Sequence, residues 1–168
     1  ETGKVTINVK SSGNFSAGGA FQTIKDYCED IVNKASVEVR GTIAGNSYIG
    51  GAIVNANNYN RLRVKNEGNI SIYAEVKSEL RFGGLVHSQG GTTSTYTESY
   101  NSGDLTVASG AKVAKCLMGG LAYDAAGKVT FKDCYNSGML TIAKGATVKE
   151  CRIGGLVANV TSSTTTNY

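Results

Sequence analysis

The chain has 168 residues, the size of one ordinary domain, and carries a formal net charge of +4 with 22 glycines and no proline or tryptophan. No apolar run approaches the roughly 18 residues of a membrane span, and no dense run of Lys and Arg indicates a nucleic-acid-binding surface. Its many Gly, Ser, Thr, Asn and Val residues favour short strands and tight turns over helices.

The two ends of the chain differ from the part between them. Residues 1–3 resemble a vector remnant left after removal of a secretion leader, so we expect an extracellular protein. Residues 4–12 alternate apolar and polar side chains and predict an opening strand. Residues 161–168 form a polar tail, which leaves 4–160 as a single repeat domain. Asn14, Asn69 and Asn159 each begin an Asn-x-Ser/Thr glycosylation acceptor triplet.

An internal repeat organises the domain. Its members share a sharp corner, usually a glycine, that recurs every 16 to 19 residues. The corners are Gly19, Ala35, Gly51, Gly68, Gly84, Gly103, Gly120, Gly138 and Gly155. The residue two positions after every corner is apolar, and its neighbours are mostly polar. This alternation predicts strands on both sides of each corner. We expect the corner glycines to be required because sharp turns often demand a positive φ.

The position two residues before each corner fixes the length of one coil. It alternates between Asn (33, 66, 101, 136) and a large apolar residue (Ile49, Phe82, Met118, Ile153). A coil of about 17 residues would stack buried amides on apolar neighbours, whereas one of about 34 residues stacks like on like. We therefore predict an all-β fold, a parallel β-solenoid (right-handed β-helix) of four to five coils of about 34 residues. The 17-residue coil stays open as an alternative.

Two segments fit this pattern less well. Residues 88–95, SQGGTTST, read as the longest loop of the domain. Residues 24–34 could form a helix, but Ile31 and Asn33 fall on the repeat, so we expect strand there.

The GGL and GGLV segments at Gly83, Gly119 and Gly154 and the YNSG segments at Tyr100 and Tyr135 resemble GLUG-motif repeats. The fourth position departs from that motif, because His87, Tyr123 and Ala158 stand after these segments. Such repeats occur in bacterial surface adhesins and in non-catalytic regions of IgA-specific metallopeptidases. The resemblance implies an extracellular scaffold and carries over no functional residue.

All four cysteines fall on columns predicted to point inward. Cys116 and Cys151 share one column in adjacent coils, Cys134 lies in the matching column of the other half-coil, and Cys28 lies three residues earlier in its half-coil. Buried free thiols are the first interpretation. A disulfide between Cys116 and Cys151 is the alternative, although direct neighbours in parallel strands fit its geometry poorly.

The sequence offers little to a catalytic or metal site. His87 is the only histidine, without an adjacent acid or nucleophile, and we interpret it as a surface residue. The column of Asp30, Glu98 and Asp133 is interrupted by Arg63, and that of Glu79 and Glu150 by Lys115, which indicates cross-strand ion pairs. We therefore expect no enzyme activity, no metal and no cofactor.

The outward position three residues before each corner suggests a binding surface. It contains Tyr100 and Tyr135 on the Asn half, and Tyr48, Arg81 and Arg152 on the Gly-Gly half. Tyr and Arg are enriched in protein interfaces, although exposed Tyr also simply favours strands.

The leading hypothesis is a non-enzymatic adhesin or stalk module that presents these columns to a host surface protein or glycan, without nucleic acid or membrane insertion. The alternatives are a pure spacer of a larger surface protein and a carbohydrate-active β-helix.

Overall fold

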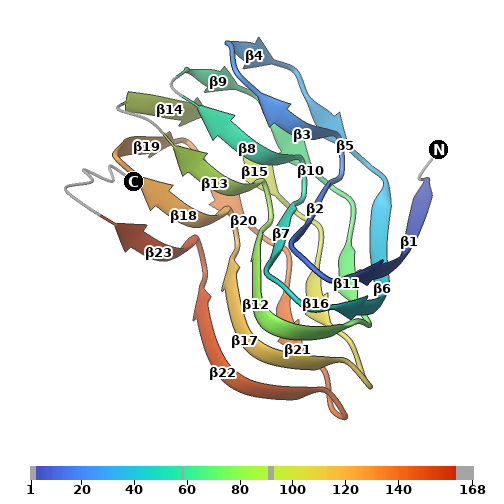
Figure 1. The fold of residues 1–168 in the computed structure, drawn as a ribbon. Helices are drawn as coiled ribbons and strands as arrows, with labels where there is room; N and C mark the ends of the chain where they lie inside the picture. The colour runs from blue at the N-terminus through green and yellow to red at the C-terminus, as the bar shows by residue number, and fades with distance from the viewer. Residues whose placement is uncertain (1–2, 58, 91–92, 162–168) are drawn as a thin grey trace.

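The chain winds into a parallel β-solenoid, described by a computed structural model for residues 3–57, 59–90 and 93–161. The described residues contain strands and no helix, four coils of five strands each, and three strands of a fifth coil (Figure 1). The predicted fold class is confirmed. The expected vector remnant and polar tail lie largely outside the described residues, which begin at Gly3 and end at Thr161.

The strands of successive coils have similar bounds relative to the corners. The first coil contains β1 (Lys4–Ser11), β2 (Phe15–Gly18), β3 (Phe21–Ile24), β4 (Cys28–Glu29) and β5 (Val32–Asn33). The second contains β6 (Ser36–Ile43), β7 (Ser47–Gly50), β8 (Ile53–Asn57), β9 (Arg61–Leu62) and β10 (Lys65–Asn66). The third contains β11 (Ile70–Ile72), β12 (Glu75–Gly83), β13 (Val86–Gly90), β14 (Thr93–Thr97) and β15 (Tyr100–Asn101). The fourth contains β16 (Leu105–Val107), β17 (Lys112–Gly119), β18 (Ala122–Ala126), β19 (Lys128–Lys132) and β20 (Tyr135–Asn136). The last contains β21 (Leu140–Ile142), β22 (Thr147–Gly154) and β23 (Val157–Thr161).

These strands stack into four parallel sheets. A bent ten-stranded sheet contains β1, β2, β6, β7 and their equivalents in later coils. The β3, β4 and β5 strands each begin a further sheet, with five, four and four strands. Three bent strands, β12, β17 and β22, lie side by side in Figure 1 and carry the ten-stranded sheet around its corner. Strand β1 confirms the predicted opening strand.

One coil contains about 34 residues, as predicted. The four asparagines pair in register, from Asn33 through Asn66 and Asn101 to Asn136. Their sequence separations are 33, 35 and 35 residues. Ile49, Phe82, Met118 and Ile153 likewise form one column. The 17-residue coil is therefore wrong, because no Asn lies over an apolar residue of its neighbouring coil.

Two hydrophobic clusters fill the interior. The bent sheet encloses the first, which includes Val39, Phe82 and Met118. The sheets that begin with β3 and β4 enclose the second, which includes Ile53, Leu85 and Tyr96. Burying each large side chain stabilises the fold by about 1.5–3 kcal/mol.

An asparagine ladder separates the two clusters. The side-chain amide of each Asn donates to the side-chain oxygen of the next, at 2.7 Å for all three steps. It also donates to a carbonyl of its own corner, for example from Asn101 to Gly103 at 2.8 Å. Asn66 and Asn101 have no exposed surface. Every buried amide therefore has partners, as burial in an apolar interior requires.

The corner glycines are required by close packing, which corrects the sequence-based reason. Their φ angles lie outside the left-handed region, whereas the described glycines with positive φ are Gly41, Gly110, Gly127 and Gly145. A Cβ on Gly84 would lie 2.1 Å from the carbonyl oxygen of Gly120 and 2.4 Å from the Asn101 side chain. A Cβ on the preceding Gly83 would lie 2.0 Å from the carbonyl oxygen of Val86. The chain thus turns so tightly against the ladder that no side chain fits at either glycine.

Two further expectations need correction. Residues 88–95 mostly continue β13 and begin β14, and only residues 91–92 of this segment lie outside the described part. The inward columns are also not buried throughout. Ile153 is 47% exposed and Leu140 is half-buried, since both lie in the last described coil, which no other described coil covers on its outer side.

Candidate functional site

Both outward columns predicted from the sequence are present in the structure. On the Asn half, Val32, Lys65, Tyr100 and Tyr135 pair in register. On the Gly-Gly half, Ser16, Tyr48, Arg81, Leu117 and Arg152 pair in register. The two columns belong to different walls of the coil, because the asparagine ladder and the Gly-Gly corners pack between them. The structure therefore offers two separate surfaces, and no single site combines all five predicted residues.

Tyr100 and Tyr135 form a stacked pair on the Asn half. Their ring centroids are 5.0 Å apart with 10° between the planes, and Tyr135 is 52% exposed. The Tyr100 hydroxyl donates to Glu67 at 2.6 Å, and this hydrogen bond raises the pKa of Tyr100 to about 12. The amine of Lys65 lies 5.5 Å from the Tyr100 ring. The pair thus forms a fixed aromatic surface that ends at β20, the last described strand of its sheet.

The side chains of Tyr48 and Arg81 contact two aromatic rings that lie just after the Gly-Gly corners, His87 on β13 and Tyr123 on β18. The His87 ring lies 5.0 Å from the Tyr48 ring and 5.3 Å from that of Tyr123, with which it stacks at 19°. The Arg81 guanidinium carbon lies 5.7 Å from the Tyr48 ring and 5.4 Å from the Tyr123 ring. We call Tyr48, Arg81, His87 and Tyr123 the aromatic notch. The small Gly83–Gly84 corner brings β12 and β13 close enough for these side chains to meet.

His87 is buried, which corrects its interpretation as a surface residue. It is 6% exposed, and neither ring nitrogen has a hydrogen-bond partner among the described residues. Burial, assisted by the positive charge of Arg81, lowers the pKa of His87 to about 4. The ring is therefore neutral at pH 7 and packs as an aromatic side chain. The sequence did not predict this burial, because the GGLVH segment does not indicate that Tyr48 and Tyr123 of neighbouring coils pack against the ring.

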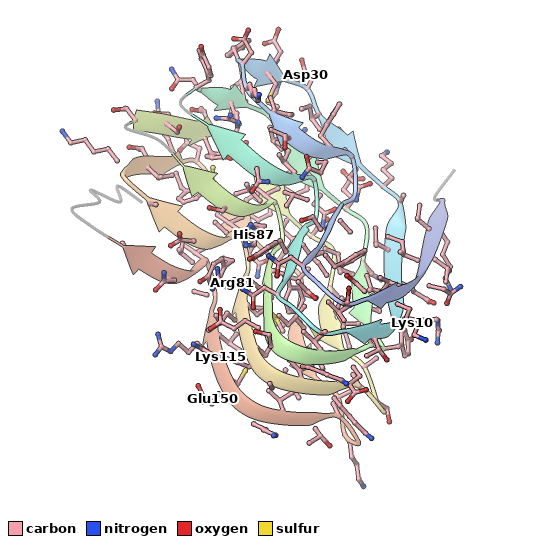
Figure 2. All side chains as sticks on the ribbon, in the orientation of Figure 1. Lys10, Asp30, Arg81, His87, Lys115 and Glu150 are labelled. Carbon is pink, nitrogen blue, oxygen red and sulfur yellow. The ribbon has the colours of Figure 1, made fainter. Side chains whose placement is uncertain are left out.

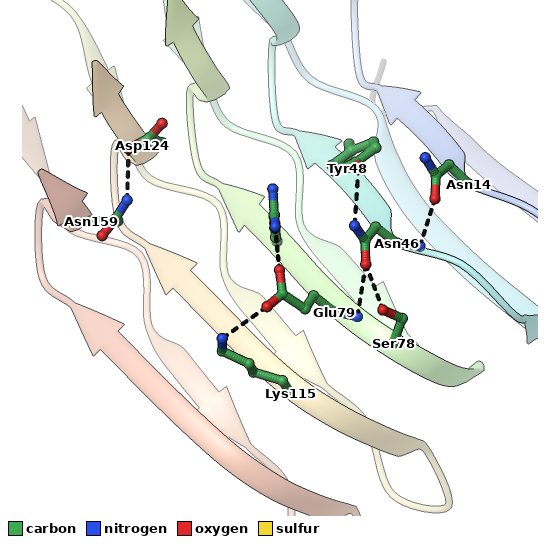
Figure 3. A network of polar contacts seen from close by, with 9 residues as sticks. Asn14, Asn46, Tyr48, Ser78, Glu79, Lys115, Asp124 and Asn159 are labelled. Atoms are coloured by element: carbon green, nitrogen blue, oxygen red, sulfur yellow. Dashed lines mark hydrogen bonds and ion pairs between the residues drawn. The ribbon is translucent and has the colours of Figure 1, made fainter. Parts of the chain in front are cut away.

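A polar network fixes the notch from the side (Figure 3). The Glu79 carboxylate accepts hydrogen bonds from Arg81 and from Lys115, the latter at 2.8 Å. These bonds, with Lys115 first, hold the pKa of Glu79 below its usual value. The Asn46 side chain donates to the Tyr48 hydroxyl at 3.2 Å and accepts from Ser78 at 2.6 Å. Arg81 and Tyr48 are thus held in one orientation by neighbouring coils.

Arg152 stands apart from the notch. Leu117 lies between it and Arg81 in the column, and Leu117 is only 5% exposed. Arg152 itself is exposed in the last described coil. The structure therefore brings Tyr48 and Arg81 together and leaves Arg152 exposed two coils beyond Arg81. Figure 2 labels Arg81 and His87, which lie close together in that view.

Each carboxylate column contains a predicted cross-strand ion pair, Asp30 with Arg63 and Glu79 with Lys115. Arg63 donates two hydrogen bonds to Asp30, at 2.6 and 2.8 Å, and these bonds lower the pKa of Asp30. Asp30, Arg63, Glu98 and Asp133 all have φ between 52° and 54°, so one left-handed turn repeats in four coils. Among the described residues no group of three His, Cys, Asp or Glu side chains is arranged to hold a metal ion.

The cysteines lie where the columns place them, but their burial differs. Cys116 and Cys151 are register neighbours, and all four thiols are free. Cys116 is buried, which raises the pKa of its thiol, whereas Cys28 and Cys134 are half-buried and Cys151 is exposed. The expectation that all four are buried therefore holds in full only for Cys116 and is wrong for Cys151 in the last described coil.

The asparagines of the three acceptor triplets all bond to neighbouring coils. Asn14 accepts from the Asn46 backbone at 2.9 Å, Asn69 accepts from the Asp104 backbone at 2.8 Å, and Asn159 donates to Asp124 at 2.9 Å. A glycan on Asn159 would use the nitrogen that now bonds Asp124, whereas Asn14 and Asn69 use only their oxygens here.

Comparisons with protein families, curated proteins and solved structures found no match to this chain. The described residues include no helix that could cross a membrane.

Proposed function

We propose that this chain is a rigid, non-enzymatic binding module of a secreted or cell-surface protein that contacts a host surface protein or glycan. The resemblance to GLUG-motif adhesins motivates the proposal. The observation that carries it is the register of the outward columns, which holds aromatic and cationic side chains at the spacing of the coils. The hydrogen-bonded ladder beneath makes this surface stiff, so little order needs to be gained on binding.

The surface that fits this role best is the Tyr100–Tyr135 pair. The two stacked rings are prealigned, and Tyr135 is exposed. Tyrosines of this kind supply large contact area with little loss of side-chain entropy. Tyr48 and Arg81 provide a second candidate surface, and Arg152 belongs to the same outward column.

A binding screen with matched variants tests the proposal. The intact chain is applied to panels of host surface proteins and glycans, beside a Tyr100→Ala/Tyr135→Ala double variant and a Tyr48→Ala/Arg81→Ala double variant. We expect at least one double variant to lose binding while its unfolding remains cooperative. A ligand that binds both double variants as tightly as the intact chain would remove these columns from the proposal.

A pure spacer within a larger surface protein is the second candidate. The burial of the aromatic notch favours it, since His87 and Tyr123 are 6% and 8% exposed and their rings contact one another. In this case the outward aromatic residues stabilise the coil stack and meet no ligand. The spacer predicts no binding across the same panels and a lower melting temperature for the Tyr48→Ala/Arg81→Ala variant.

A further inference from the structure

A shallow groove runs along the solenoid axis where the ten-stranded sheet bends. One part of it, about 310 Å³ in volume, crosses β12, β17 and β22 and is lined by Lys77, Lys112 and Lys149. A second part, about 580 Å³, crosses β1 and β6 and contains Lys10. Lys77 lines both parts, so the two form one continuous surface across all five coils.

Two outward columns build this groove. In the first, Lys10, Thr42, Glu75, Lys112 and Thr147 are paired in register. The second lies two residues further along the chain and contributes Ala44, Lys77, Ala114 and Lys149. The register between β12 and β17 shifts between Val76 and Glu79, next to Lys77, and this irregularity accompanies the bend. Small side chains thus form the floor, and lysines rise from it in four of the five coils.

The groove is positively charged and its cations are free. It contains four lysines and one acid, Glu75. None of the four lysines forms an ion pair within the described part of the chain, whereas Lys4, Lys34 and Lys115 do. All four are exposed, and Figure 2 shows Lys10 at the end of β1 beside β6. An anion that binds here would gain charge contacts without breaking existing ones.

We propose that this groove binds a linear acidic polysaccharide, with its chain along the solenoid axis and its carboxylate or sulfate groups on the lysines. Four strand spacings, from the first coil to the fifth, span about 19 Å, which suits a short stretch of an extended sugar chain. The side-chain hydroxyls of Thr42 and Thr147 lie in the floor and can bond the sugar hydroxyls.

A polysaccharide fits this groove better than a single-stranded nucleic acid. Sites for single strands combine basic residues with aromatic side chains on which bases stack. The described lining contains no aromatic residue and no arginine. Lysines on a floor of small residues recognise repeated anionic groups as point charges.

Binding of four probes at fixed salt tests this inference. The probes are polygalacturonate for carboxylates, dextran sulfate for sulfates, neutral dextran, and a single-stranded oligonucleotide. We expect at least one acidic polysaccharide to bind and neutral dextran not to bind. A Lys77→Gln/Lys112→Gln variant should bind about tenfold more weakly, and Glu75→Gln about threefold more tightly.

The matched control is Lys128→Gln/Lys132→Gln, which changes the net charge equally but lies on exposed positions of β19. We expect it to bind like the intact chain. Equal weakening by both double variants would show a general charge effect and overturn the groove. Failure of both acidic polysaccharides to bind, or tighter binding of the oligonucleotide, would overturn it as well.

The groove shares no residue with the tyrosine columns or the aromatic notch. The Tyr100→Ala/Tyr135→Ala variant should therefore bind the acidic polysaccharide normally. The result for the lysine variants is thus independent of the result for the proposed host-binding columns.

Discussion

Asn101 shows how much of this fold can depend on one polar side chain. Its amide nitrogen donates to Gly103 and Asn136, and its oxygen accepts from Asn66. The side chain also lies where a Cβ on Gly84 would fall. A smaller residue here would leave buried polar groups on three sides without partners, and such groups are costly in an apolar interior.

Replacing Asn101 with Ala should lower the free energy of unfolding by about 2–3 kcal/mol, since several buried hydrogen bonds are lost together. Asn136→Ala should cost only about 1 kcal/mol, because Asn136 ends the described ladder and is half-buried. Chemical denaturation measures the free energy of unfolding of both variants. The control is Ser102→Ala at an exposed position, whose free energy of unfolding should stay within about 0.5 kcal/mol of that of the unmodified chain. Equal losses for Asn101→Ala and Ser102→Ala would contradict the ladder.

His87 predicts a pH dependence of stability. Its pKa in the fold is about 4, below the ordinary value of 6.5, so the unfolded chain binds the proton more readily. The resulting stability is complete above about pH 6.5 and is lost as the pH falls toward 4. The full effect is on the order of 3 kcal/mol, from about 1.4 kcal/mol per pKa unit.

The measurement is the melting temperature between pH 4 and 7 for the unmodified chain and for His87→Phe, which keeps a ring between Tyr48 and Tyr123. Between pH 6.5 and 4 the melting temperature of the variant should fall much less than that of the unmodified chain, because His87 is the only histidine. Parallel curves for the two proteins would mean that His87 is not buried as described.

At the scale of an element, the Gly-Gly corner depends on contacts between coils. The first glycine leaves room for the carbonyl two residues beyond the corner, and the second leaves room for the next coil and the ladder. Neither requirement concerns the φ angle of the turn itself. The second glycine of the motif should therefore tolerate alanine where no further coil packs on it, whereas the first should not, because a Cβ on Gly154 would still lie 2.0 Å from the carbonyl oxygen of Val157.

Gly120 and Gly155 allow a direct comparison, because they hold the same position in adjacent coils. A Cβ on Gly120 would lie 2.0 Å from the Gly155 carbonyl oxygen and 2.6 Å from Asn136, whereas a Cβ on Gly155 meets nothing within 4 Å. Gly120→Ala should destabilise the fold by about 3 kcal/mol or more, and Gly155→Ala by less than about 0.5 kcal/mol. Thermal unfolding compares them. A similar loss for both would indicate that the turn itself requires glycine.

At the scale of the whole molecule, the position of a coil in the stack decides how deeply its inward residues are buried, and therefore how much they stabilise the fold. Met118 has no exposed surface, whereas Ile153 is 47% exposed in the same column. Each coil of a solenoid packs only against its neighbours, so the outermost described coil is covered on one side only.

An aspartate at Met118 should abolish cooperative unfolding, because an unpaired charge in the interior is very costly. Ile153→Asp should leave the fold intact and cost about 1 kcal/mol, since its carboxylate can remain in water. Circular dichroism during thermal unfolding distinguishes the two. A folded Met118→Asp variant would contradict the core assignment.

Sequence periodicity alone determined the fold class and the membership of the columns, because stacking forces each position to repeat the chemistry of its neighbours. The alternation of Asn33, Asn66, Asn101 and Asn136 with large apolar residues favoured a coil of about 34 residues, and the register of the strands then decided against one of about 17. Only the tertiary structure decided which corners face each other, why their glycines are needed and that His87 is buried. Those properties depend on the angle between strands and on contacts across the coil, which a one-dimensional repeat does not encode.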